Sequence, residues 1–83
     1  SDERVVKAYY DVKQYDKVLD IWKVRAERTP QDPQAHVSLA AAYLLNNNRA
    51  ESIAELKRAS EINPAFKVQA DAYIKEIRAG RNP

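Results

Sequence analysis

The residues from Ala35 to Leu45, AHVSLAAAYLL, place the strongest constraint on how this chain can fold. At the 3.6-residue period of a helix, their apolar side chains form two stripes instead of one. The first stripe contains Ala35, Leu39, Ala42 and Tyr43, and the second contains Val37, Ala41, Leu44 and Leu45. A helix that is apolar on two sides must be covered on both of them, so we predict that this helix is central.

The residues around the central helix carry the signals that begin and end helices. Asp32 can accept a hydrogen bond from the first turn, and Pro33 suits the first helical position. Asn46, Asn47 and Asn48 end the apolar pattern. The expected helix therefore spans about residues 33–45.

Apolar spacings of three and four predict four further helices. The first is capped within residues 1–3 and runs to about 12, the second spans about 15–28, the fourth runs from the Asn48–Glu51 capping box to 62, and the fifth spans about 65–79 before Gly80. With one glycine among 83 residues and no long linker, these helices predict a single all-α domain over residues 1–83. Neighbouring helices joined by such short turns should be antiparallel.

The chain is similar to itself at an offset of 34 residues. Identical pairs at this offset include Ala8 with Ala42, Tyr9 with Tyr43, Lys23 with Lys57, Glu27 with Glu61, and Pro30 with Pro64. A helical hairpin repeated at this period is typical of a solenoid, in which each hairpin buries its apolar face on the next one.

Residues 33–64 resemble the tetratricopeptide repeat family, whose pattern spaces W-x2-L-G-x2-Y, then A-x3-F and a closing proline. The pattern positions hold His36, Leu39, Ala40, Tyr43, Ser52, Leu56 and Pro64, and the preceding repeat keeps Val5, Tyr9, Val18, Trp22 and Pro30. The resemblance implies a right-handed α-solenoid of about two and a half repeats. It would consist of a helical hairpin at 1–30, a second hairpin at 33–64 and a C-terminal capping helix at 65–80.

The residues offer little for catalysis or for a cofactor. The chain has no cysteine, and its one histidine, His36, has no metal-ligating partner at i+3 or i+4, so we predict a packing role for it and no metal site. No serine lies in a nucleophile turn, and the Glu51–Glu55 pair is expected on a solvated face. We therefore expect neither an enzyme nor a cofactor.

Charge and hydropathy argue against nucleic acid and membranes as direct partners. The net charge of +2 is too small for a concentrated basic surface, and no apolar run approaches the roughly 20 residues of a membrane helix. We expect a soluble domain without nucleic-acid binding or direct membrane insertion, in a compartment that the sequence leaves unknown. A chain that begins with Ser1 and lacks methionine is interpreted as a piece of a larger protein.

The family resemblance implies a concave groove built by the first, third and fifth helices. Helical phase then selects the groove residues. They are Lys7, Tyr10 and Asp11 from the first helix; Gln34, Val37, Ser38, Ala41, Leu44 and Leu45 from the central helix; and Asp71, Lys75 and Arg78 from the fifth. An apolar floor with charged sides suits a peptide or an amphipathic helix of a partner protein. The sequence therefore predicts a non-catalytic protein–protein interaction module.

Two alternatives use the same stripe differently. Leu44 and Leu45 could be covered by the flanking helices in a compact bundle, which would leave no groove. The stripe could instead be a dimer interface of a homo-oligomer, because short solenoids leave apolar surface exposed. In every case Trp22 is expected to be largely buried between the first two helices and the central one.

Overall fold

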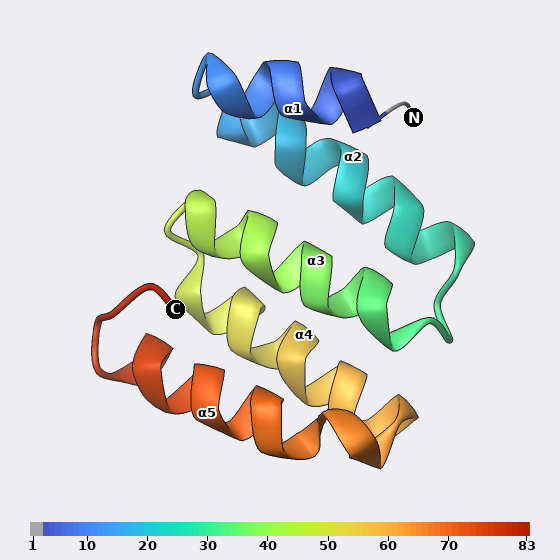
Figure 1. The fold of residues 1–83 in the computed structure, drawn as a ribbon, viewed down its shortest axis with the longest axis vertical. Helices are drawn as coiled ribbons and strands as arrows, with labels where there is room; N and C mark the ends of the chain where they lie inside the picture. The colour runs from blue at the N-terminus through green and yellow to red at the C-terminus, as the bar shows by residue number, and fades with distance from the viewer. Residues whose placement is uncertain (1–2) are drawn as a thin grey trace.

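The computed structural model describes residues 3–83, which form five α-helices and one 3₁₀ turn (Figure 1). The elements are α1 (Glu3–Asp11), α2 (Tyr15–Arg28), α3 (Pro33–Leu45), α4 (Arg49–Ile62), the 3₁₀ turn (Pro64–Phe66) and α5 (Lys67–Arg78). The prediction of an all-α domain with five helices is confirmed. The cap expected in the first residues involves residues 1 and 2, which lie outside the described part of the chain.

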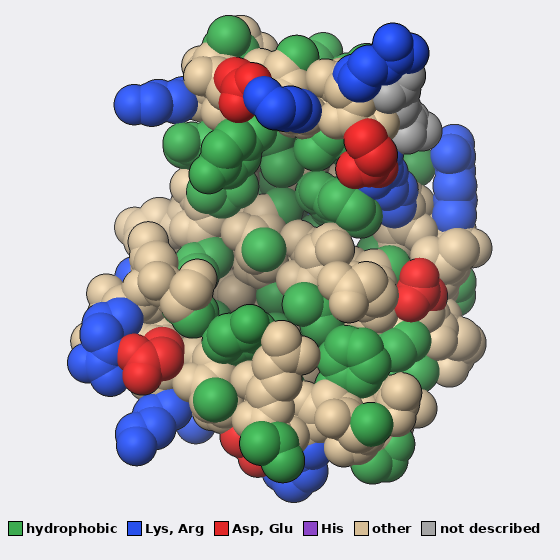
Figure 2. Space-filling view, viewed as in Figure 1, with side chains coloured by type: hydrophobic (Ala, Val, Ile, Leu, Met, Phe, Trp, Pro, Cys, Tyr) green, Lys and Arg blue, Asp and Glu red, His purple; other side chains and the backbone are tan. Residues whose placement is uncertain are grey.

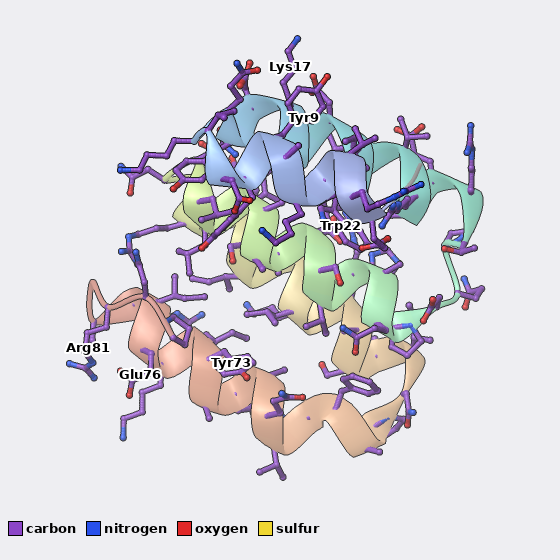
Figure 3. The ribbon with its side chains drawn as sticks, turned by 45° about the horizontal axis from the view of Figure 1, so that its top comes forward. Tyr9, Lys17, Trp22, Tyr73, Glu76 and Arg81 are labelled. Carbon is purple, nitrogen blue, oxygen red and sulfur yellow. The ribbon has the colours of Figure 1, made fainter. Side chains whose placement is uncertain are left out.

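The helices pack in chain order, α1 against α2, α2 against α3, α3 against α4 and α4 against α5. Figures 1 and 3 show α1, α3 and α5 on one side of the domain, with α2 and α4 behind them. The domain is flat, with principal extents of 31 × 28 × 16 Å. Such a shape gives the front helices one broad, open face.

The core consists of two clusters, one on each side of α3. The first contains Val18, Leu19, Ala26, Ala35, Leu39 and Ala42, and the second contains Ala40, Leu56, Ala70, Ile74 and Ile77. Because α3 supplies side chains to both clusters, the prediction that it is the central helix is confirmed.

The predicted signal at the start of α3 and the predicted signal at the end of α5 both form as expected. The Asp32 side chain accepts a hydrogen bond from the N–H of Gln34 at 3.0 Å. Gly80 takes a φ of +83° and ends α5, and the Arg81 N–H beyond it donates to the Glu76 carbonyl at 2.9 Å. A positive φ of this kind is accessible to glycine without strain, which explains the single glycine of the chain.

The capping box predicted for Asn48 and Glu51 is wrong. The Asn48 side chain makes no capping hydrogen bond, and its φ and ψ of −92° and 72° are not those of an extended cap residue. Its backbone N–H donates instead to the Tyr43 carbonyl at 2.9 Å. The tight turn between α3 and α4 therefore decides the conformation of Asn48.

The fifth helix begins two residues later than predicted. Residues Pro64–Phe66 form a 3₁₀ turn, and the Asn63 side chain accepts a hydrogen bond from the Ala65 N–H at 3.0 Å. The α-helix starts at Lys67. A side chain before a proline that accepts from the amide after the proline favours a tighter first turn.

The first helix buries less than its apolar pattern predicts. Val5 is 44% exposed, and Val12, which follows the end of α1, is 64% exposed. Of the apolar residues of α1, Val6 and Tyr9 pack against the first core cluster. The physical reason is that α1 is the outermost helix and packs mainly on α2. An apolar stripe is buried only where a neighbouring element covers it.

Trp22 packs against the first core cluster as expected, although its burial is incomplete. Its ring is half-buried against the first core cluster, and the Arg25 guanidinium lies 4.4 Å from the ring centroid. Arg25 is held there by an ion pair with Glu3, Nη1 to Oε1 at 2.6 Å. The Arg25 cation thus lies over the part of the indole that the core leaves open.

Truncation of Trp22 should therefore lower the free energy of unfolding by less than truncation of a fully buried tryptophan would. We expect Trp22→Ala to lower the free energy of unfolding by about 2 to 3 kcal/mol, below the roughly 3 to 5 kcal/mol of fully buried aromatic residues. Urea unfolding followed by circular dichroism measures this loss. Val24→Ala, at an exposed position of the same helix, should change it little. A loss for Trp22→Ala as small as that of the control would contradict the packing described above.

Candidate binding groove

A hollow of about 300 Å³ separates α1 from α3. Its lining residues are Glu3, Val6, Lys7 and Tyr10 from α1, Val18 and Trp22 from α2, and Ser38, Ala41, Ala42 and Leu45 from α3. Figure 2 shows hydrophobic side chains gathered on this face between α1 and α3 and again along α5. The floor of the hollow is apolar, while its charged groups come from the rim on α1.

Two further hollows lie along α3 and share residues with the first. One, of about 190 Å³, reaches α5 and is lined by Val37, Ala40, Ala41, Leu44, Ser52, Leu56, Tyr73, Ile77 and Pro83. The other, of about 260 Å³, is lined by Tyr10, Ala41, Leu44, Leu45, Asn82 and Pro83. Because exposed Ala41 lines all three hollows, they form one continuous surface, which we call the α3 groove.

Seven of the predicted groove residues lie in the α3 groove. They are Lys7, Tyr10, Val37, Ser38, Ala41, Leu44 and Leu45. Tyr10 is 50% exposed, and its ring contacts the Tyr15 ring with centroids 5.8 Å apart. The structure thus brings the second stripe of α3 together with the open side of α1.

The stripe itself is half-covered. Val37 and Leu44 pack against the second core cluster, and Leu45 packs against the first. Only Ala41, between them, is exposed. The groove is therefore a shallow apolar trough whose sides belong to the core.

The structure places Asp71, Lys75 and Arg78 away from the α3 groove, so this part of the predicted grouping does not form. They line a separate hollow of about 430 Å³ between α4 and α5, together with Lys57 and Lys67. The phase of α5 is set by burying Ala70, Ile74 and Ile77. Tyr73 and Ile77 then face α3, as Figure 3 shows for Tyr73, and the charged residues turn toward α4.

Gln34 and Asp11 are also outside the α3 groove. Gln34 lines a neighbouring hollow of about 320 Å³ with Trp22, Arg28 and others, around the start of α3. Asp11 accepts a hydrogen bond from the Lys7 ammonium at 2.6 Å, and both side chains are exposed. An exposed pair four residues apart on a helix contributes little to stability, and Asp11 lines none of the three hollows.

Among the residues that the sequence reasoning missed are Asn82 and Pro83, which line the groove, and Arg49, which holds them in place. Arg49, at the start of α4, donates from Nη1 to the carbonyls of Ile77 at 3.0 Å and Arg81 at 3.1 Å. From Nη2 it donates to the Gly80 carbonyl at 3.2 Å and to Asn82 Oδ1 at 2.7 Å. These bonds join residues about thirty positions apart, so no local pattern could have indicated them.

A second contact orders the same C-terminal segment. The Arg81 guanidinium donates a hydrogen bond to the Glu76 carboxylate on the last turn of α5 (Figure 3). This hydrogen bond holds the pKa of Glu76 below its usual value. The carboxylate is therefore ionised, and available to Arg81, at neutral pH.

Two buried polar side chains, His36 and Glu55, form a network away from the groove. His36 Nδ1 lies 2.8 Å from Glu55 Oε2, and His36 Nε2 lies 2.7 Å from the Pro30 carbonyl oxygen. The other carboxylate oxygen of Glu55 accepts from Arg58 Nη1 at 2.6 Å. The packing role predicted for His36 agrees with its burial, because these contacts leave no ring nitrogen open to a ligand.

The expectation that Glu55 lies on a solvated face is wrong. Glu55 is 5% exposed, on the side of α4 that faces α3. A carboxylate is tolerated there because a histidine and an arginine both donate to it. Glu51, one turn earlier, is exposed as predicted.

Within residues 3–83, no three metal-ligating side chains come together, and no helix is long and apolar enough to cross a membrane. Comparisons of the chain with family models, with curated proteins and with solved structures found no match. A functional argument for this domain therefore rests on the α3 groove itself.

Proposed function

We propose that this domain is a non-catalytic protein–protein interaction module that binds an extended peptide segment of a partner protein in the α3 groove. The observation that carries the proposal is the position of Ala41. It is exposed at the centre of three adjoining hollows whose floors are apolar. A small residue in the middle of an apolar trough leaves room for a partner side chain.

The size of the groove favours an extended peptide over a helix. The three hollows measure between about 190 and 300 Å³, enough for a few side chains each. A docked α-helix would need a trough about 10 Å wide along its whole length. An extended segment can instead place alternate side chains in successive hollows.

The rim has the mixed polarity expected around an apolar binding surface. Lys7 and Glu3 stand on the α1 side, and Ser38 supplies a hydroxyl on α3. Since the basic and acidic groups nearly balance, the rim selects no strongly charged partner. The apolar floor is then the main source of affinity.

The repeat architecture is part of this proposal. Helices α2 and α4 have the same length and start 34 residues apart. The turns before these two helices have the same hydrogen bond. The Gln14 N–H donates to the Tyr9 carbonyl and the Asn48 N–H donates to the Tyr43 carbonyl, each at 2.9 Å. Lys13 and Asn47 both take a φ of +60° in these turns. These recurrences support about two and a half tetratricopeptide-like repeats in a right-handed solenoid, capped by α5.

The proposed function can be tested by filling the groove without disturbing the core. Peptides would be selected from a randomised display library against the unaltered domain, and their affinities measured by isothermal titration calorimetry. Ala41→Gln should weaken binding about tenfold or more, equivalent to roughly 1.4 kcal/mol. Ala54→Gln, at an exposed alanine of α4, is the matched control and should bind as the unaltered domain does. Equal affinities for both variants would contradict the proposal.

The same variants separate peptide binding from self-association. If the groove were a homodimer interface, light scattering after gel filtration would show a mass that rises with concentration and that Ala41→Gln returns to the monomer. We expect a monomer at all concentrations, because half of the stripe is already covered by the domain's own helices.

A further inference from the structure

The C-terminal residues Arg81, Asn82 and Pro83 fold back from the end of α5 toward α3 and α4 (Figure 1). Gly80 turns the chain, and the three residues that follow are not helical. Pro83 lines two of the three hollows of the α3 groove, where it meets Ala41 and Leu44, and Asn82 lines one of them. The protein thus places a short, exposed segment of its own at the edge of the site proposed for a partner.

Arg49, which lies beside the three hollows and lines none of them, holds this segment against the end of α5. Two of the Arg49 hydrogen bonds go to main-chain carbonyls of the segment and its turn, those of Gly80 and Arg81. Carbonyls occur in every peptide, so this recognition does not depend on the side chains of the bound segment. The apolar ring of Pro83 supplies the contact with the groove floor.

We propose that residues 81–83 occupy the subsite that a partner's proline-bearing, non-helical segment takes in the complex, so that the tail and the partner compete for it. This inference rests on the proposed function and adds two things to it. The ligand class is a segment with a proline or a similar compact apolar side chain next to exposed carbonyls. Arg49 is the clamp for that segment, and the tail lowers the apparent affinity of the free domain.

The competition is reversible because residues 81–83 are exposed and make few contacts besides those with Arg49. Apart from Arg49, its side-chain contact is the exposed Arg81–Glu76 pair, and exposed ion pairs contribute little. When a segment of the same chain fills a binding site most of the time, the apparent affinity for a ligand is the intrinsic affinity multiplied by the fraction of time that the site is open. Weakening the tail alone should therefore strengthen binding of a ligand that uses the same subsite.

The probe for this test is a blocked synthetic peptide that copies residues 80–83, Gly-Arg-Asn-Pro, titrated into the full chain and followed by NMR. We expect the amide and methyl signals of Ala41 and Leu44 to shift. In the Pro83→Gly variant the apparent Kd should fall about tenfold, if the tail fills the subsite about nine-tenths of the time. The matched control is the peptide Gly-Arg-Asn-Gly, which should bind far more weakly. Equal binding of the two peptides, or equal Kd values for the two proteins, would overturn the inference.

A second readout needs no ligand. The line broadening of the Ala41 and Leu44 methyl signals by a soluble nitroxide measures how open the groove is. Arg49→Gln should increase this broadening because it frees the tail, while Arg78→Gln, an equivalent change at an exposed position of α5, should leave it unchanged. Unchanged broadening in Arg49→Gln and in Pro83→Gly together would show that the tail does not cover the groove.

These results are distinguishable from a failure of the proposed function. A display-selected peptide that loses affinity in Ala41→Gln but binds Pro83→Gly and the unaltered protein equally would leave the peptide-binding function intact and refute the competition. A selected peptide whose affinity changes neither in Ala41→Gln nor in Pro83→Gly would refute both the proposed function and the competition.

Discussion

Leu39→Asp is expected to unfold the domain, whereas Leu44→Asp is expected to leave it folded. Leu39 is 4% exposed in the first core cluster, so an aspartate there would be a charged group without a partner. Burying such a group costs several kcal/mol, comparable with the roughly 4 to 12 kcal/mol expected for the whole stability of a domain of this size. Leu44 is half-buried at the edge of the groove, where a carboxylate can reach water.

Circular dichroism at 222 nm and a thermal scan measure both variants. For Leu39→Asp we expect the loss of most of the helical signal at room temperature. For Leu44→Asp we expect a cooperative transition with a loss of about 1 to 2 kcal/mol from its contacts with the second cluster. Unfolding of the two variants to the same extent would show that Leu44 is core and that the groove edge is not open.

The second large effect is expected at the buried polar network. Glu55→Ala removes the acceptor shared by His36 and Arg58 and leaves His36 Nδ1 buried without its partner. Breaking a buried pair by deleting one member costs roughly 3 to 5 kcal/mol. We expect a loss of that size in urea unfolding for Glu55→Ala.

Glu51→Ala is the matched control for this change, because Glu51 lies one turn earlier on the same helix and is exposed. Its effect should stay within about 0.5 kcal/mol. A double-mutant cycle with His36→Ala then isolates the interaction between the two side chains. If Glu55→Ala and Glu51→Ala lower the free energy of unfolding by the same amount, the network contributes no net stability.

The helices and their turns could be predicted because their causes are local. The α2 helix spans the predicted residues, and the Asp32 cap and the Gly80 stop act within a few residues of themselves. Backbone hydrogen bonding and apolar periodicity operate over three to five positions, which a sequence displays directly. The double stripe of α3 likewise predicted a helix with core on both sides.

The candidate site could be predicted only in part. The stripe on α3 and the residues Lys7 and Tyr10 on α1 were found, because phase on one helix depends only on that helix. The rotation of α5 about its own axis could not be predicted, because it depends on how Ile74 and Ile77 pack against α4. The charged residues expected in the groove consequently line another hollow.

The sequence by itself determined which segments are helical, which helix is central and which of its stripes is left over. Only the tertiary structure decided that Glu55 is buried, that Arg25 covers Trp22, and that Arg49 holds the C-terminal segment at the groove. The difference has one physical reason. Helix formation depends on neighbours in the chain, whereas burial, ion pairing and clamping depend on groups from other helices that meet only when the helices pack.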